Sequence, residues 1–259
     1  MASASNQIFD FLPYWTWFLL AVRTTTLLMF LPGIGTAEIP AQYRMFLSYS
    51  LAALIAFGGV RAHAPATVAE GGLMIGVEVL VGYLLALAPV FILQGLAVSG
   101  QLISGSIGLS FANIFDPLTE HQVPVLARVQ TYIGTAVFMV MDGHHAVIRA
   151  LAGEGTTLGV GAYRPGELTA ELILNRFADI FQLAISFAAP ILVAVLVTNF
   201  VLGLITKAVP QVNVFIIGMP LTLGMGFYLA GFTLPAIAER VVSEFNEMPE
   251  IVLKLLQSN

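Results

Sequence analysis

The stretch VLVGYLLALAPVFILQGLAVSGQLISGSIGLSFANIF, from Val79 to Phe115, contains no charged residue and decides how the rest of the chain is interpreted. A helix needs about 20 apolar residues to cross a bilayer, because each residue rises about 1.5 Å against a hydrocarbon core of about 30 Å. This stretch exceeds that length by roughly half, even for a tilted helix. The sequence therefore predicts a helix that is kinked at Pro89 and runs to about Gly100. The segment after Gly100 is not expected to continue that helix.

The composition places the chain in a membrane. Hydrophobic residues make up 58% of it and charged residues only 10%, whereas soluble domains carry roughly 25% charged residues. The mean hydropathy of +0.90 agrees, so most helices are expected to face lipid or one another. The net charge of -5 includes no basic cluster, which excludes a nucleic-acid partner. The chain has no cysteine, which excludes disulfides and thiolate metal sites.

The apolar segments predict an all-α protein with about six hydrophobic helices. The polar segment from Ala152 to Arg176 predicts a boundary between two parts of the chain. Beyond it, Lys207 and the turn Pro210 to Asn213 separate two long uncharged runs, which predicts a helical hairpin. The tail from Glu239 to Asn259 is amphipathic and is expected to lie on a surface. The expected apolar helices are Phe11 to Leu31, Met45 to Val60, Leu73 to about Gly100, Val129 to about Leu151, Ile180 to Thr206 and Ala208 to Ala238.

Glycines and serines fill the far end of the uncharged stretch. Gly100, Gly105 and Gly108 allow two interpretations. In the first, the glycines let helices pack closely. In the second, they form a broken segment at membrane depth, which is tolerated only inside protein or beside a water-filled cavity. The accompanying large side chains suit a constriction that closes a pore by dewetting. These side chains are Ile103, Ile107, Leu109, Phe111, Ile114 and Phe115.

Three charged residues lie inside apolar segments, where each needs a partner or a wet surface. Arg23 fits either an ion pair or pore contact with another subunit, or a buried pair within the chain. For Glu78 and Asp142 we expect partners on neighbouring subunits.

His144 and His145 are adjacent, so on a helix they should point about 100° apart and should not share a metal ion. We expect polar packing for them, with a metal site or proton relay as the alternative. Asp142 and His144 have no nucleophile elbow beside them, so an intramembrane hydrolase is disfavoured. The sequence therefore predicts no catalytic residue, no metal site and no cofactor.

The run from Gly100 to Pro117 resembles the FliR family, the flagellar member of the type III secretion export gate. The resemblance covers nearly the whole chain, and it rests on an ordered set of short motifs. The other motifs are Arg23 with Leu31-Pro32 and Ile39-Pro40, Gly143-His144-His145, Ala189-Pro190, Asn199 with Gly203-Leu204, and Pro210-Gln211-Val212-Asn213-Val214-Phe215.

The resemblance implies a non-enzymatic subunit that assembles with FliP and FliQ into a ring for unfolded flagellar proteins. It divides the chain into a FliP-like part (about 1–151), a polar connection (152–176), a FliQ-like hairpin (177–238) and the amphipathic tail (239–259). It places Pro210, Gln211 and Asn213 near FlhB, and the whole chain in the bacterial inner membrane as a multi-pass protein of the flagellar basal body. Within the glycine-rich segment 100–117, the implied plug residues are Gly105, Ser106, Ile107, Gly108, Leu109, Ser110, Phe111, Phe115, Asp116 and Pro117.

A second functional class remains open at this point. Secondary transporters also use broken glycine-rich helices and isolated membrane charges, because these features build substrate sites. The sequence shows no obvious internal repeat of the kind that such carriers often contain. A polytopic transporter of a small solute is therefore the alternative to the export gate.

Overall fold

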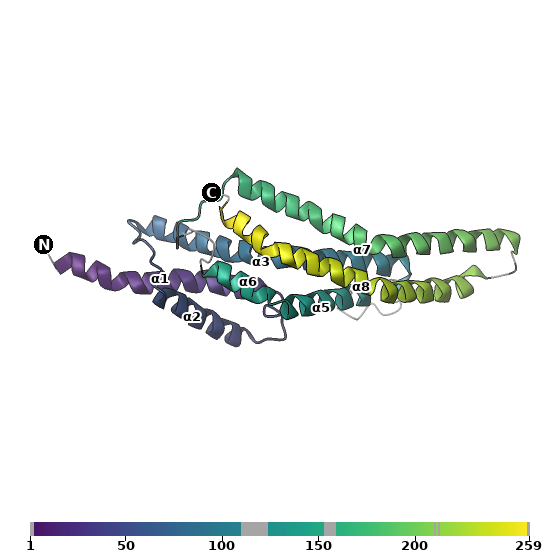
Figure 1. The fold of residues 1–259 in the computed structure, drawn as a ribbon, viewed down its shortest axis with the longest axis horizontal. Coiled ribbons are helices and arrows are strands. Elements are labelled where there is room, and N and C mark those ends of the chain that lie inside the picture. Colours follow the sequence, from purple (N-terminus) through teal and green to yellow (C-terminus); the bar gives the residue numbers. More distant parts are fainter. Residues whose placement is uncertain (1–2, 110–123, 153–158, 210, 212, 258–259) are drawn as a thin grey trace. The chain divides into compact units, whose positions relative to one another are not determined.

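The computed structural model describes residues 3–109, 124–152, 159–209, 211 and 213–257. Within these ranges the chain forms seven helices and no strand, which confirms the all-α prediction. Three helices of the described part are long and apolar enough to cross a membrane: α3, α7 and the stretch Ile216–Leu256 of α8. Figure 1 shows α1 (Ser3–Phe30), α2 (Ala41–Phe57), α3 (Val68–Ser106), α5 (Val125–Val140), α6 (Gly143–Leu151), α7 (Glu167–Ala208) and α8 (Val214–Gln257).

Several helices have other bounds than the sequence predicted; α7, for example, begins at Glu167 rather than at Ile180. α3 does not stop near Gly100 but continues to Ser106. The expected helix from Val129 to Leu151 is divided into α5 and α6, because Asp142 adopts a left-handed backbone with φ 55°. A left-handed L-residue cannot continue a right-handed helix, so the chain turns at this residue.

Packing divides the chain into two compact units, and neither is a continuous stretch of sequence. Unit 1 comprises Met1–Val90, Phe138–Asn175 and Phe245–Asn259, and unit 2 comprises Phe91–Val137 and Arg176–Glu244. The helices α3, α5, α7 and α8 each contribute residues to both units.

In unit 1, α1 and α2 lie side by side (Figure 1). The Thr24 hydroxyl donates to the Ser48 carbonyl at 3.0 Å, and the hydroxyls of Thr25 and Ser48 are 2.9 Å apart. These bonds satisfy polar groups that cannot reach water inside an apolar assembly. The core beside them contains Leu19, Leu20, Ala21, Ala52, Ala62, Met74 and Val160.

The C-terminal part of α8, from Phe245 onward, belongs to unit 1. Phe245 packs on Phe138 with ring centroids 5.3 Å apart. The buried Tyr163 hydroxyl donates to the Leu255 carbonyl at 3.1 Å and bonds to the Thr169 hydroxyl at 3.0 Å. Unit 1 buries the apolar side of the tail, whereas Glu247 and Lys254 are exposed. The buried residues of this side are Phe245, Met248, Ile251, Val252, Leu255 and Leu256.

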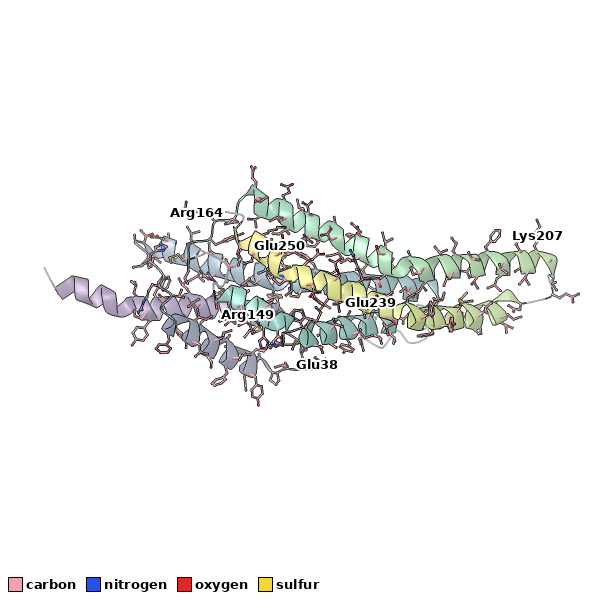
Figure 2. All side chains as sticks on the ribbon, in the orientation of Figure 1. Glu38, Arg149, Arg164, Lys207, Glu239 and Glu250 are labelled. Atoms are coloured by element: carbon pink, nitrogen blue, oxygen red, sulfur yellow. The ribbon has the colours of Figure 1, made fainter. Side chains whose placement is uncertain are left out.

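In unit 2, α7 and α8 form the predicted hairpin, joined by residues 209–213 (Figure 1). Lys207 lies in the last turn of α7, at the end of the hairpin (Figure 2), where a cation is favoured by the helix dipole. The base of the hairpin packs against the ends of α3 and α5. The buried residues of this core are Ile103, Ile107, Leu126, Ala188, Ile191 and Val195.

Candidate functional site: the end of α3 and the buried charges

The last turn of α3 contains the first of the predicted plug residues. Gly105 and Ser106 are exposed, and the Ser106 hydroxyl donates to the Leu102 carbonyl at 2.9 Å. Gly108 has φ 88°, a left-handed conformation that glycine adopts without the steric cost of a Cβ atom. A left-handed glycine just beyond a helix is a common way to end it. The glycine thus sets the point where the chain leaves the helix axis.

Ile107 anchors this turn in the core of unit 2. Its side chain is fully buried beside Ile103, and its amide donates to the Ile103 carbonyl at 3.0 Å. The α8 residue Gly226 approaches Ile107 so closely that a Cβ atom there would overlap the isoleucine side chain. Leu109 is partly buried against the same cluster. The remaining predicted plug residues, which are Ser110, Phe111, Phe115, Asp116 and Pro117, lie outside the described residues.

The sequence left two interpretations open for the glycines of this segment, close helix packing and a broken segment. Gly100 and Gly105 differ in this respect. Gly100 lies against the backbone of Ala127 with no room for a side chain, so it serves close helix packing. Ser99 supports the same contact by donating to the Gln130 side-chain oxygen at 2.7 Å. Gly105 is different, because no described atom outside its own helix lies within 4 Å of a Cβ built there. Packing therefore explains Gly100, whereas Gly105 lies on an open face.

Arg23 and Glu78 form a buried ion pair between α1 and α3. The Arg23 Nη2 atom donates to Glu78 Oε1 at 2.9 Å, and its Nε atom donates to Oε2. Arg23 is 4% exposed and Glu78 0% exposed. The amide of Gly161 also donates to Oε1, at 2.5 Å. The structure thus selects the intrachain alternative for Arg23, and it replaces the neighbouring subunit that was expected as partner of Glu78.

Asp142 is the third predicted charge, and it has an intrachain partner as well. Its carboxylate accepts a hydrogen bond from His145 Nδ1 at 3.0 Å, and both side chains are more than half exposed. We expected the side chains of His144 and His145 to point in different directions. Their rings nevertheless lie close together, with centroids 4.1 Å apart.

The predicted hairpin loop is described only in part. Gln211 and Asn213 are exposed between α7 and α8, and Pro210 lies outside the described residues.

Sequence reasoning missed the contribution of the polar connection to unit 1. Gly161 has φ 75° and supplies the third bond to Glu78, and Tyr163 is buried at 1% exposure. An available signal was the pair of Val160 and Tyr163 among polar neighbours, since large apolar side chains in a polar segment often mark a packed loop.

Comparison with known proteins assigns the chain to a family. The model of the bacterial export proteins, family 1, matches residues 14–248. The chain belongs to this family, whose flagellar members are called FliR. It is 30% identical to the flagellar biosynthetic protein FliR of Escherichia coli strain K12 over 97% of both chains. The FliR protein of Aquifex aeolicus strain VF5 is 28% identical over 91% of this chain and 92% of its own, and that of Bacillus subtilis strain 168 is 25% identical over 97% of both.

The family match includes residues of both packing units. Residues 14–248 include Arg23, Glu78, the end of α3 and the whole α7–α8 connection. Membership in the FliR family therefore makes this chain a component of bacterial export, with helices apolar enough for a membrane.

Proposed function

We propose that this chain is the FliR-type subunit of the flagellar type III export gate. It forms, with FliP and FliQ, the pore through which unfolded flagellar proteins pass, in the bacterial inner membrane at the flagellar basal body. The observation that carries the proposal is the family match over residues 14–248 together with relatives named as flagellar biosynthetic proteins. The protein acts without chemistry on its substrates, as a channel component needed for flagellum assembly.

The apolar surface of the α7–α8 hairpin supports a partnership with other helices. Between Ile180 and Thr206 there is no charged residue, and many large side chains there face outward. In a ring these side chains would pack on FliP and FliQ helices, and elsewhere they would face lipid. In this proposal α7 and α8 form the FliQ-like part, the preceding chain to about residue 151 the FliP-like part, and the loop around Gln211 and Asn213 contacts FlhB. The exposed residues on α7 include Ile185, Val193, Leu196, Val197, Phe200 and Leu204.

The end of α3 supports a plug in the segment 105–117. Ile107 holds the base of the segment in a packed core, and Gly108 turns the chain away from the helix in a conformation that glycine adopts freely. A plug must stay attached to the protein and must also move when a polypeptide passes. Attachment at Ile107 and a glycine at position 108 suit both requirements. Apolar side chains beyond that base would block ions by making hydration unfavourable.

The subunit assignment is tested by complementation and co-purification. A flagellated strain that lacks its own FliR gene should regain motility and secretion of flagellar proteins when this chain is expressed. The tagged chain should retain FliP and FliQ after detergent extraction. A chain that purifies as a stable monomer and is stabilised by a small solute would instead be a transporter, and the gate assignment would fall.

The plug is tested by placing a charge at the open end of α3. Gly105→Asp adds a carboxylate where the described residues leave space, so a folding defect within the chain is not expected. We expect the variant to leak ions or to assemble poorly, because a charge disrupts a dry constriction. Gly108→Asp should act similarly but adds backbone strain.

Gly72→Asp is the matched control, because this glycine is an exposed position of the same helix with equally open described surroundings. It should leave ion leakage and secretion at the level of the unmodified chain. Normal leakage and normal secretion in the Gly105→Asp variant would refute the plug assignment.

A further inference from the structure

The corner between α5 and α6 brings together three side chains of the kind that bind metal ions. Asp142, His144 and His145 each offer one ligand atom, and these atoms all lie within 4.8 Å of one another. Asp142 Oδ1 and His145 Nδ1 are already 3.0 Å apart. A transition-metal ion bound at about 2.1 Å holds neighbouring ligand atoms roughly 3 to 3.4 Å apart. One edge of a coordination site is therefore present, and a ligand atom of His144 lies within 4.8 Å of both of its atoms.

The backbone that carries these ligands is fixed by packing rather than by the side chains themselves. Asp142 holds a left-handed φ of 55°, and its carbonyl accepts the amides of His145 at 2.9 Å and Ala146 at 3.2 Å. Gly143 lies so close to the ring and carbonyl of Phe138 that a Cβ atom there would overlap them. A ligand set carried on a rigid turn loses little freedom when an ion binds.

The hydrogen bonding leaves ligand capacity unused. Within the described part of the chain, His144 Nδ1 is buried and has no hydrogen-bond partner. A buried ring nitrogen without a partner is rare in folded proteins, and a bound cation would satisfy it. The proton shared by His145 and Asp142 can leave to solvent when an ion replaces it, since these side chains are 55% and 68% exposed.

We propose that Asp142, His144 and His145 bind a divalent first-row transition-metal ion of the Zn²⁺ class. Two imidazoles and one carboxylate match that class, whereas Mg²⁺ and Ca²⁺ prefer all-oxygen sites. Three protein ligands leave at least one coordination position for water. The bound ion links Asp142, at the corner between α5 and α6, to the two histidines of α6. The sequence predicted no such structural metal. This inference does not depend on the export function.

The experiment uses the full chain in detergent with a purification tag that lacks histidine. Equilibrium dialysis against Zn²⁺ should give one bound ion per chain, and Co²⁺ should produce the visible absorption of nitrogen and oxygen coordination. His145→Ala and Asp142→Asn should each weaken binding by about tenfold or more. Both changes affect exposed side chains, and asparagine tolerates the left-handed backbone at 142, so helicity and monodispersity should be unchanged.

His63→Ala is the matched control, because His63 is an exposed histidine whose ring nitrogen lies 3.3 Å from the Glu70 carboxylate. The His63→Ala variant should keep the Zn²⁺ affinity of the unmodified chain. The proposal is overturned if the unmodified chain binds no stoichiometric Zn²⁺ or Co²⁺. It is equally overturned if His145→Ala and Asp142→Asn keep the original affinity, or if binding is lost in the His63→Ala variant instead.

Discussion

The buried pair of Arg23 and Glu78 makes a quantitative prediction about stability. Glu78→Leu removes both the charge that compensates Arg23 and the acceptor of the Gly161 amide. Removing one member of a buried ion pair costs about 3–5 kcal/mol, and leaving a buried amide without a partner costs about 1–3 kcal/mol. The sum of about 4–8 kcal/mol is comparable to the whole stability of many proteins, which is about 5–15 kcal/mol. We expect this variant to accumulate poorly in the membrane.

The double variant Arg23→Met with Glu78→Leu should be more stable than either single variant. It leaves no unpaired charge, and replacing a buried ion pair with apolar side chains is often neutral or stabilising. The unpaired Gly161 amide remains, so a deficit of about 1–3 kcal/mol relative to the unmodified chain should persist. Exchanging the two charges should not restore stability, because an arginine at position 78 has no acceptor for that amide.

The assay is the steady-state level of each variant in membranes, together with the fraction that stays monodisperse in detergent after heating. Glu38→Leu is a matched control, because Glu38 is an exposed carboxylate between α1 and α2 (Figure 2). Its replacement should change both readouts little. Equal stability of Glu78→Leu and the unmodified chain, or a double variant no better than the single ones, would refute the buried pair.

Three further changes test the packing. Gly82→Leu should lower stability by about 1–3 kcal/mol, because the α1 backbone leaves no room for a side chain; Gly76→Leu, with no described atom within 4 Å of its Cβ, should be nearly neutral in the same heating assay. Tyr163→Phe should cost about 1 kcal/mol and expose the end of α8 to protease, since the hydroxyl bond to that helix is lost; an unchanged digestion pattern would contradict this. Gly108→Ala should cost about 1–2 kcal/mol for its left-handed backbone, whereas Gly105→Ala should leave the heating midpoint unchanged or slightly raised.

Local sequence patterns predicted the helices better than their ends. The two uncharged runs and the turn between them correctly indicated the α7–α8 hairpin, because hydropathy and turn residues act within a few positions of one another. The division of the Val129–Leu151 segment was missed, since an aspartate with a left-handed φ carries no distinct signal in an otherwise apolar stretch.

The candidate site was predicted in its residue types but not in its partnerships. Gly108 belongs to the glycines for which the sequence left close packing and a broken segment open, and the sequence did not indicate its left-handed φ of 88°. The sequence left the partner of Arg23 open, and it placed Ile107 in a plug without indicating its burial against α7. Both questions depend on which helix faces which, and apolar helices look alike whether they face lipid or one another.

The sequence by itself determined that this is an all-α membrane chain of the export family with a glycine-rich end to its longest early apolar stretch. Composition and ordered short motifs suffice for that, because they are properties of neighbouring residues. The tertiary structure decided the contacts between residues far apart in the chain. Glu78 meets a residue 55 positions away and another 83 away, and Tyr163 meets one 92 away. Hydropathy does not encode such pairings, because many packings bury the same apolar surface and only the folded backbone brings one donor to one acceptor.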